Sequence, residues 1–466
     1  MFFTSPNDTV PLPVTGLDRL AQGLDRHKLL IFFIPFLIYM INGREISSGD
    51  PTPSLFTAIN LSKKGTIFLD DFHDYVAYHS IPFYLSEQRG HLVSNYPIFP
   101  GVMATPLVAP AAWAGLLPKG EGDLVWKYLA KLSGSIYTSL SVLFLYLTLR
   151  RLIDPGGAVV LAMAYGLGTA LWPIASQSLW QHGPSVFWWT VCFYALLRGA
   201  REEETLPASA RLARWLLLAG FAAGGAVLCR TVNGIGGAVL CLGILVHFRW
   251  RAAWFVAPYL ALMALLLGYN LYIFGSWKGG DVVLHSLQWE LDRIDTGAWA
   301  TPLPVGLAGQ LVSPSRGMFI FSPFLLFSIW GMVHLLRQKD RGGRLFAWTI
   351  PIPILMFLVF SKYSVWWGGN SHYGPRYQIE TYPFLMLYLA CLWPRLAGSR
   401  RWMTVFLVLL AFSIWVQWVG AFCYPSEWTV KPVPLWEDKG RFWDWRYNQI
   451  WSCAASGVKK PDLFLP

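Results

Sequence analysis

The sequence has few charged residues for its length. Only 14% of its 466 residues are Asp, Glu, Lys or Arg, whereas 55% are hydrophobic and the mean hydropathy is +0.42. Soluble globular proteins are about a quarter charged, so a water-soluble fold is excluded. The chain instead carries repeated long apolar runs, which are typical of a protein that crosses a membrane many times.

The sequence also lacks the common nucleotide-binding and hydrolase motifs. It has no P-loop, no dinucleotide-binding glycine fingerprint, no nucleophile elbow and no HExxH motif. Its six cysteines follow no metal-ligand spacing, so we interpret them as buried spectators, with a disulfide between Cys423 and Cys453 left open. The net charge of +11 comes without a basic run interleaved with aromatic residues, which excludes nucleic acid as a partner.

The apolar runs predict an all-α polytopic membrane protein with about eleven transmembrane helices. The predicted crossings are Leu29–Ile41, Leu124–Leu149, Gly157–Pro173, Gly183–Leu197, Leu212–Cys229, Gly234–His247, Ala252–Phe274, Met318–Leu336, Leu345–Phe360, Ile379–Trp393 and Trp402–Cys423. Charged residues at mid-helix depth are nearly absent, and ion-coupled transporters usually keep such residues, so a transporter is disfavoured.

The positions of Lys and Arg set the predicted orientation. Cytoplasmic loops collect these residues, which places the basic segments between alternate crossings, and the N-terminus, on the cytoplasmic side. This arrangement requires that the Pro-rich apolar run Gly101–Leu117 does not cross, so we expect it to be a juxtamembrane or re-entrant helix. We predict one membrane domain, residues 1–423, whose long first outer loop, residues 43–123, carries the acidic site, and a short outer-face tail, residues 424–466.

Candidate catalytic carboxylates lie in this first outer loop. Asp50 follows the first crossing within about ten residues, where it could accept a proton from a hydroxyl nucleophile; the alternative is a turn or a helix cap, because Asp-Pro-x-Pro-Ser also favours turns. Asp70, Asp71 and His73 form a denser polar cluster, which could hold a divalent cation or could simply begin a helix. Their spacing matches no defined set of metal ligands.

Basic residues at outer helix ends are candidates for binding a lipid phosphate. Arginine forms two parallel hydrogen bonds to phosphate oxygens, and Arg230 and Arg376 both lie at predicted outer ends of helices. Lys63 and Lys64, near the aspartate cluster, are weaker candidates of the same kind. The alternative for each residue is that its side chain extends to the membrane interface without binding a substrate.

Other polar side chains on the predicted outer loops are candidates for a substrate pocket. They stand beside aromatic residues in Trp180-Gln-His-Gly-Pro184 and in Trp366-Trp-Gly-Gly-Asn-Ser-His-Tyr-Gly-Pro-Arg-Tyr377. Aromatic residues alone are ordinary at membrane interfaces and indicate nothing further. The candidates are His182, His372, Tyr373 and Tyr377, together with His73.

The order of these motifs resembles the GT-C-fold membrane glycosyltransferases, which take sugars from polyprenyl-phosphate or polyprenyl-diphosphate donors, as the dolichyl-phosphate-mannose-protein mannosyltransferases and aminoarabinose transferases do. The resemblance runs over most of the chain. It rests on Gly49-Asp50, Asp70-Asp71-Phe72, Asn95-Tyr96-Pro97-x-x-Pro100-Gly101, Trp180-Gln-His-Gly-Pro184, Ser313-Pro-Ser-Arg-Gly317 and Gly374-Pro-Arg-Tyr377 before Tyr382-Pro383.

The resemblance implies an inverting transfer on the outer face of the inner or cytoplasmic membrane. Asp50 would be the catalytic base, Asp70 or Asp71 the second acidic position, and Arg376 and Arg230 the donor-phosphate ligands. The implied partners are a polyprenyl-phosphate sugar and a lipid, glycan or protein acceptor, and a divalent cation is the one cofactor left open. The alternatives are a lipid-linked-sugar flippase and a glycan ligase or polymerase.

Overall fold

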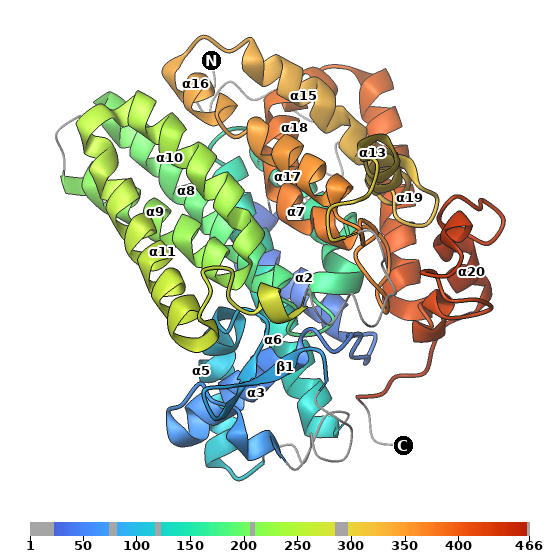
Figure 1. The fold of residues 1–466 in the computed structure, drawn as a ribbon. Coiled ribbons are helices and arrows are strands. Elements are labelled where there is room, and N and C mark those ends of the chain that lie inside the picture. The colour runs from blue at the N-terminus through green and yellow to red at the C-terminus, as the bar shows by residue number, and fades with distance from the viewer. Residues whose placement is uncertain (1–22, 74–81, 117–122, 206–209, 285–296, 464–466) are drawn as a thin grey trace.

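A computed structural model describes residues 23–73, 82–116, 123–205, 210–284 and 297–463. It is predominantly helical, as predicted, and each predicted crossing contains a helix (Figure 1). These helices are α2 (Leu30–Met40), α6 (Leu124–Leu149), α7 (Pro155–Leu167), α8 (His182–Thr205), α9 (Ala210–Cys229), α10 (Gly234–Phe248), α11 (Ala253–Phe274), α15 (Leu326–Leu336), α17 (Pro351–Lys362), α18 (Tyr382–Ala397) and α19 (Arg400–Cys423).

Five helical stretches of the described residues are long and apolar enough to cross a membrane. They are Leu124–Leu149, Ala210–Cys229, Thr231–Phe274, Arg341–Lys362 and Arg400–Cys423. The third of these contains two helices, α10 and α11, joined through Arg249–Ala252. Shorter apolar helices, such as α2 and α7, accompany them. The number of eleven crossings therefore stays a prediction.

Polar side chains fix several helix starts at the residues where the sequence changes from loop to apolar run. Asp123 accepts a hydrogen bond from the backbone N–H of Val125 at the start of α6, and Asp154 accepts one from Gly157 at the start of α7. Such caps satisfy N–H groups that have no partner inside the helix. Pro155 follows Asp154 at the first helical position of α7, where its missing N–H costs nothing.

Small residues let the helices approach one another closely. A Cβ atom added to Gly220 of α9 would lie 2.0 Å from the backbone oxygen of Phe255 in α11, and one added to Gly331 of α15 would lie 2.0 Å from that of Tyr388 in α18. Neither position has room for a side chain. Packing through small residues is characteristic of helices in membranes, where dispersion contacts replace the hydrophobic effect between helices.

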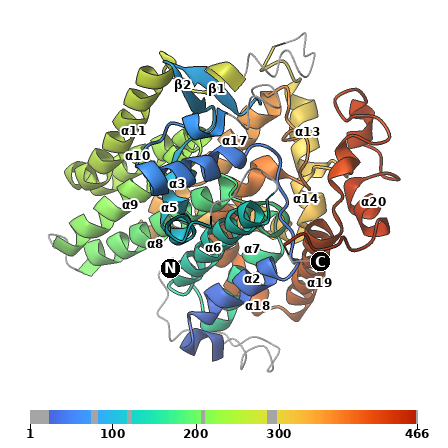
Figure 2. The same cartoon turned by 90° about the horizontal axis from the view of Figure 1, so that it is seen from below.

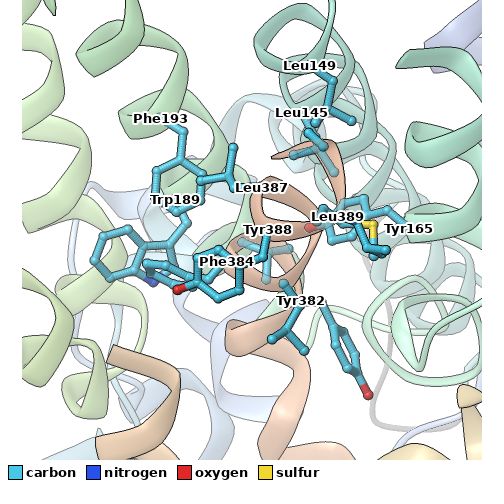
Figure 3. Close-up of a cluster of buried hydrophobic side chains, with 14 of the residues drawn as sticks. Leu145, Leu149, Tyr165, Trp189, Phe193, Tyr382, Phe384, Leu387, Tyr388 and Leu389 are labelled. Carbon is cyan, nitrogen blue, oxygen red and sulfur yellow. The ribbon is translucent and has the colours of Figure 1, made fainter. Parts of the chain in front are cut away.

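The core around α18 positions the functional segment that precedes this helix. Figure 3 shows the side chains of α18 meeting those of α6, α7 and α8. The Phe384 ring lies 5.1 Å from the Trp189 ring and 4.9 Å from the Phe193 ring, measured between centroids. The short helical segment η6 (Arg376–Thr381) leads directly into α18, so this packing fixes η6 as well.

The described part of the predicted first outer loop forms a layer at one end of the molecule. It contains α3 (Thr52–Lys64), η1 (Asp70–Phe72), β1 (Leu85–Gln88), β2 (His91–Ser94) and α5 (Phe99–Trp113). Figure 2 looks onto this end, where α3 and α5 lie side by side. The close approach depends on Gly101, because a Cβ atom there would lie 2.4 Å from the Ser54 backbone oxygen.

The strands β1 and β2 correct the expectation of a purely helical chain. They pair antiparallel, with Gln88 opposite His91. The two residues of the turn, Arg89 and Gly90, both have positive φ, at +54° and +80°. Positive φ at both central residues is the type I′ geometry that matches the twist of a hairpin.

The remaining elements lie between α11 and α17 and in the tail. They are α13 (Leu303–Val312), α14 (Met318–Phe321), η5 (Pro323–Leu325), α16 (Arg341–Ala347), η7 (Ser426–Thr429), η8 (Lys439–Phe442) and α20 (Gln449–Ala455). The tail packs on α19, and Figure 1 shows α20 beside this helix. The Trp415 ring of α19 and the Trp451 ring of α20 lie 5.3 Å apart between centroids. Cys423 and Cys453 are both buried here as free thiols.

The loops predicted for the two sides of the membrane form two separate groups. At one end Glu203 lies 3.5 Å from Arg251 and 2.7 Å from Arg341, which joins three loops predicted to be cytoplasmic. Figure 1 shows α16 at this end, opposite α3, α5 and β1. At the other end Asp50 of the first predicted outer loop pairs with Arg376 of the last one. The candidate residues Asp50 and Arg376 therefore lie at this second end.

Candidate active site

A buried ion pair joins Asp50 to Arg376. The Arg376 Nη2 atom donates to Asp50 Oδ2. Only 10% of the Asp50 side chain and 13% of the Arg376 side chain are exposed. The Tyr96 hydroxyl donates to the other carboxylate oxygen, Asp50 Oδ1, at 2.9 Å. Both oxygens of this carboxylate therefore have a donor, one charged and one neutral.

The local backbone places Asp50 just before the start of helix α3. The N-cap residue of this helix is Pro51, which makes no side-chain capping hydrogen bond. Gly49 precedes Asp50 and packs under Tyr84, whose ring carbons would lie 2.7 Å from an added Cβ atom. The Asp50 side chain extends to Tyr96 and Arg376.

Arg376 is also held through its flat face. Its guanidinium carbon lies 4.7 Å from the centroid of the Trp180 ring, and the Trp180 Nε1 atom donates to the Ile46 backbone oxygen at 3.1 Å. Burial lowers the pKa of Arg376, but the charge of Asp50 raises it. The net result is a pKa above the ordinary value for arginine. A guanidinium stacked and paired in this way is a permanent, fixed positive charge.

A second ion pair, between Arg230 and Glu380, lies nearby. Arg230 Nη1 donates to Glu380 Oε2, and His182 Nδ1 lies 2.8 Å from Glu380 Oε1. Arg230 Nη1 also lies 3.2 Å from His182 Nδ1, so the three side chains form one network. The Glu380 and His182 side chains are 1% and 3% exposed. A buried carboxylate of this kind must keep its partners, because an unpaired buried charge is expensive.

The ring of Tyr377 lies close to both arginines. Its centroid is 6.0 Å from the guanidinium carbon of Arg376 and 5.4 Å from that of Arg230. The same ring stacks on Phe360, with centroids 4.3 Å apart. The two ion pairs are therefore neighbours, and we call them together the twin-pair site. Its residues are Asp50, Tyr96, Trp180, His182, Arg230, Arg376, Tyr377 and Glu380.

The other acidic candidates have partners of their own, which are not those of Asp50. Asp70 and Asp71 lie in η1, where the neighbouring Phe72 ring packs on the Phe56 ring of α3, with centroids 3.7 Å apart. Asp70 accepts from the Leu92 backbone N–H at 2.8 Å and lies 2.8 Å from His91 Nδ1, which attaches η1 to the hairpin. Burial raises the pKa of Asp70, but the bonds from His91 and Leu92 lower it below its ordinary value.

The lysines and the histidine near Asp70 are likewise separate from the twin-pair site. Lys64 Nζ lies 2.5 Å from Asp71 Oδ1, with 56% of the lysine side chain exposed. Lys63 is exposed at the end of the same helix. His73 lies 3.9 Å from Asp70 Oδ1. The structure thus brings Lys64 to Asp71 and His73 to Asp70, and none of them to Arg376.

A metal site does not emerge from the described residues. They contain no group of three or more His, Cys, Asp or Glu side chains placed to hold an ion. Asp50 and Glu380 each use both oxygens on donors of the protein. Asp74, the next acidic residue after His73, lies outside the described residues. The donor set therefore does not fit a metal at the twin-pair site.

His372 and Tyr373 lie in the loop just before Arg376. Both are buried, and the Tyr373 hydroxyl donates to the Val416 backbone oxygen of α19 at 3.0 Å. Gly420 leaves the space that the Tyr373 ring fills, because an added Cβ atom would lie 2.3 Å from it. Burial lowers the pKa of His372 well below its usual range, and the charges of Arg316 and Arg376 lower it further. His372 is therefore a neutral ring close to two cations.

Sequence reasoning missed three polar residues that the structure makes prominent. Glu380 carries the second ion pair, and Tyr96 was part of a motif without a role. Lys131 of α6 is completely buried, and its Nζ atom donates to Gln177 Oε1 at 2.5 Å and Asn42 Oδ1 at 3.0 Å. Glu380 and Lys131 both lie inside predicted crossings, where an ionisable residue is itself a signal of function.

Comparison with known proteins identifies the fold. No family model and no curated protein matches the sequence. ArnT from Cupriavidus metallidurans bound to undecaprenyl phosphate has a similar structure, with a TM-score of 0.54 and 14% identity over 88% of this chain and 68% of that one. The Archaeoglobus fulgidus oligosaccharyltransferase tethered to an acceptor peptide gives a TM-score of 0.53 and 12% identity, covering 89% of this chain and 58% of that one.

The same archaeal enzyme in its apo form gives a TM-score of 0.51 at 12% identity, covering 84% of this chain. This chain spans 55% of the archaeal enzyme's length. Another structure of that enzyme, with Zn and sulfate, gives a TM-score of 0.50. Both neighbours are polyprenyl-phosphate-dependent glycosyltransferases of the GT-C fold, so the predicted GT-C fold is confirmed.

Proposed function

We propose that this GT-C-fold chain is an integral membrane glycosyltransferase that moves a sugar from a polyprenyl-phosphate donor to an acceptor hydroxyl. The observation that carries the proposal is the buried pair of Asp50 and Arg376, a carboxylate and a guanidinium held where the first and last outer loops meet. The reaction needs these two groups: a base for the acceptor and a fixed cation for the phosphate that leaves.

The donor phosphate binds Arg376 in competition with Asp50. A phosphate monoester or diester offers oxygens that match the fork of a guanidinium. The Arg376 Nε atom is buried and has no hydrogen-bond partner among the described residues, so one donor is available before any bond breaks. When phosphate oxygens take over the guanidinium, the Asp50 carboxylate loses its charged partner and is free to accept a proton.

The transfer then proceeds in one inverting displacement. The acceptor oxygen forms a bond to the anomeric carbon, the bond from that carbon to the phosphate oxygen breaks, and the acceptor proton moves to Asp50. Polyprenyl phosphate leaves with the electron pair of the broken bond. Arg376 stabilises the charge that grows on this leaving group more than it stabilises the bound donor, and such preference for the transition state is what accelerates a reaction.

Arg230 supports the same phosphate from the neighbouring pair. Its guanidinium carbon lies 5.4 Å from the centroid of the Tyr377 ring, and Glu380 and His182 hold it there. Glu380 and His182 act through Arg230 and are positioning residues in this proposal. No step is routed through a metal, because the donor set at the site does not fit one; a chelator added to the assay described below tests dependence on a divalent cation.

The proposed site faces the outer side of the inner or cytoplasmic membrane. This placement is supported by the grouping of the basic loops at the opposite end of the molecule, since Lys and Arg favour the cytoplasmic side. The acceptor is a lipid, glycan or protein hydroxyl. The last outer loop and the tail lie around the site, so acceptor recognition belongs to these membrane-proximal segments.

The experiment that tests the proposal is transfer from synthetic polyprenyl-phosphate sugars in nanodiscs, with product size measured by mass spectrometry. We expect a gain of one sugar on the acceptor. A gain of a whole glycan from a glycan-charged donor alone indicates a ligase or polymerase. Movement of the lipid-linked sugar across a liposome bilayer, without any transfer, contradicts the proposal in favour of a flippase.

A further inference from the structure

The C-terminal tail reaches into the loop that carries Arg376, and the contact runs through one side chain. Gln449, the first residue of α20, is completely buried. Its Oε1 atom accepts from the Gly374 backbone N–H at 2.8 Å, and its Nε2 atom donates to the His372 backbone oxygen at 2.9 Å. From these contacts we infer that Gln449 is a positioning residue for Arg376, an inference that rests on the proposed function.

The loop depends on such an external support. Four of its residues have left-handed backbone conformations, with φ of +93° at Gly368, +86° at Gly369, +58° at Ser371 and +72° at Gly374. A chain that turns in this way forms no regular ladder of backbone hydrogen bonds. The amide of Gln449 supplies an acceptor for Gly374 and a donor for His372, which stand two and four residues before Arg376.

Arg316 fixes the amide of Gln449 in turn. Its Nη1 atom donates to Gln449 Oε1 and, at 3.0 Å, to the Ser315 backbone oxygen. The Arg316 side chain is buried under the Trp428 ring, whose centroid lies 5.5 Å from the guanidinium carbon. Among the described residues it has no carboxylate partner. Hydrogen bonds to oxygens such as Gln449 Oε1 therefore compensate this buried charge.

Further hydrogen bonds attach the tail to residues 313–317, the turn that contains Arg316. The Ser313 hydroxyl donates to the Phe442 backbone oxygen at 2.6 Å. Arg441 donates to the backbone oxygens of Trp428 and Lys431 at 2.9 Å and 2.7 Å, which closes the tail around it. The tail thus connects the Ser313–Gly317 turn to the Arg376 loop, two segments that are about 60 residues apart in the sequence.

The consequence is that the tail sets the direction of the Arg376 guanidinium. Asp50 and Trp180 hold the end of this side chain, whereas Gln449 holds the backbone from which it extends. When the donor phosphate displaces Asp50, the stacking on Trp180 and the backbone support from Gln449 remain. A misplacement of about 1 Å of a group that positions a substrate can cost about 10²-fold in rate.

The test compares Gln449→Ala and Gln449→Glu with wild type in nanodiscs, using the full chain. Gln338→Ala, the same substitution at the opposite end of the molecule, is the matched control. Three quantities are measured: hydrogen exchange of the Gly374 amide, binding of undecaprenyl phosphate, and kcat and KM for transfer. Gln449→Glu keeps the acceptor for Gly374 and adds a negative charge beside the Arg316 guanidinium, but it replaces the donor to His372 with an oxygen.

In Gln449→Ala we expect the Gly374 amide to exchange at least about 10-fold faster and kcat/KM to fall about 10²-fold. Gln449→Glu should lose less of both, and Gln338→Ala should match wild type. Unchanged exchange at Gly374 overturns the inference whatever the activity is. Faster exchange with unchanged kcat/KM and unchanged lipid binding overturns the positioning role. A wild-type protein that transfers no sugar counts against the proposed function alone. The exchange experiment still tests whether Gln449 holds the backbone of the Arg376 loop.

Discussion

Asp50 and Arg376 are 326 positions apart in the sequence, yet their side chains form a buried ion pair. The pair joins the first and the last of the predicted outer loops and so closes one end of the molecule. Tyr96 and Trp180, from two further segments, complete its surroundings. A site assembled from four distant segments is typical of a reaction centre supported by a rigid scaffold of helices.

The competition between phosphate and Asp50 for Arg376 predicts how Asp50→Asn affects donor binding. This substitution removes the charge that holds the guanidinium, so we expect undecaprenyl phosphate to bind the variant at least as tightly as it binds wild type. Binding is measured by titration in nanodiscs. Glu427→Gln, a carboxylate-to-amide change on the exposed part of the tail, is the control. Weaker binding by Asp50→Asn would contradict the displacement of Asp50 by phosphate.

Two substitutions of Arg376 should distinguish the contribution of its charge to catalysis from that of its planar guanidinium. Arg376→Lys keeps a positive charge but loses the fork toward phosphate and the flat stacking on Trp180. We expect kcat/KM to fall at least about 10-fold in Arg376→Lys and further in Arg376→Ala, in the range of about 10²–10³-fold that the loss of one stabilising donor costs. Equal activity of the lysine variant and wild type would show that only the charge matters.

The pair of Glu380 and Arg230 predicts a large effect on stability. Glu380→Gln leaves Arg230 buried without its countercharge, so we expect the free energy of unfolding to fall by about 3–5 kcal/mol. Thermal unfolding in nanodiscs measures the change. The double variant Glu380→Gln with Arg230→Met removes both charges and should recover part of the loss. A double variant as unstable as the sum of both single ones would mean that the two residues do not interact.

The hydrogen bond from the Leu92 amide to Asp70 predicts that the hairpin loses stability in acid, when the Asp70 carboxylate becomes protonated. The pKa of Asp70 is lowered in the folded protein, so its contribution to stability is present above the unfolded pKa of about 3.9 and is lost as the pH falls through the lower folded pKa. The protection factor of the Leu92 amide, which is the exchange rate of an unfolded chain divided by the observed rate at the same pH, should therefore fall below about pH 4 in wild type. Asp70→Asn, compared with wild type at each pH, should show no such acid-dependent loss of protection. The same profile in both proteins would remove Asp70 as the cause.

The apolar helices were predictable because each long apolar run must bury or cross a membrane wherever it lies in the fold. The individual candidates Asp50, Arg230 and Arg376 were also identifiable, since polar residues at outer helix ends are few. Their pairing was not, because a contact between Asp50 and Arg376 depends on how α3, α5 and α18 pack. The spacing of the sequence carries no information about such a long-range contact.

Two local features could have been read from the sequence. Arg89-Gly90, between the polar segments that form β1 and β2, is a two-residue turn, and Glu380 and Lys131 are ionisable residues inside apolar runs. The role of Gln449 could not have been predicted, because a glutamine in a tail has no distinguishing pattern. Its importance arises from the two backbone groups of the Arg376 loop that it contacts.

The most direct test of glycosyl transfer with an aspartate base is a single-turnover reaction in nanodiscs with a radiolabelled polyprenyl-phosphate sugar. The sugar gained by the acceptor and the polyprenyl phosphate released are both counted. We expect equal amounts of the two in wild type and a rate about 10²–10⁴-fold lower in Asp50→Asn at saturating donor. Asp50→Asn turning over at the wild-type rate, with the donor fully bound, would contradict the account.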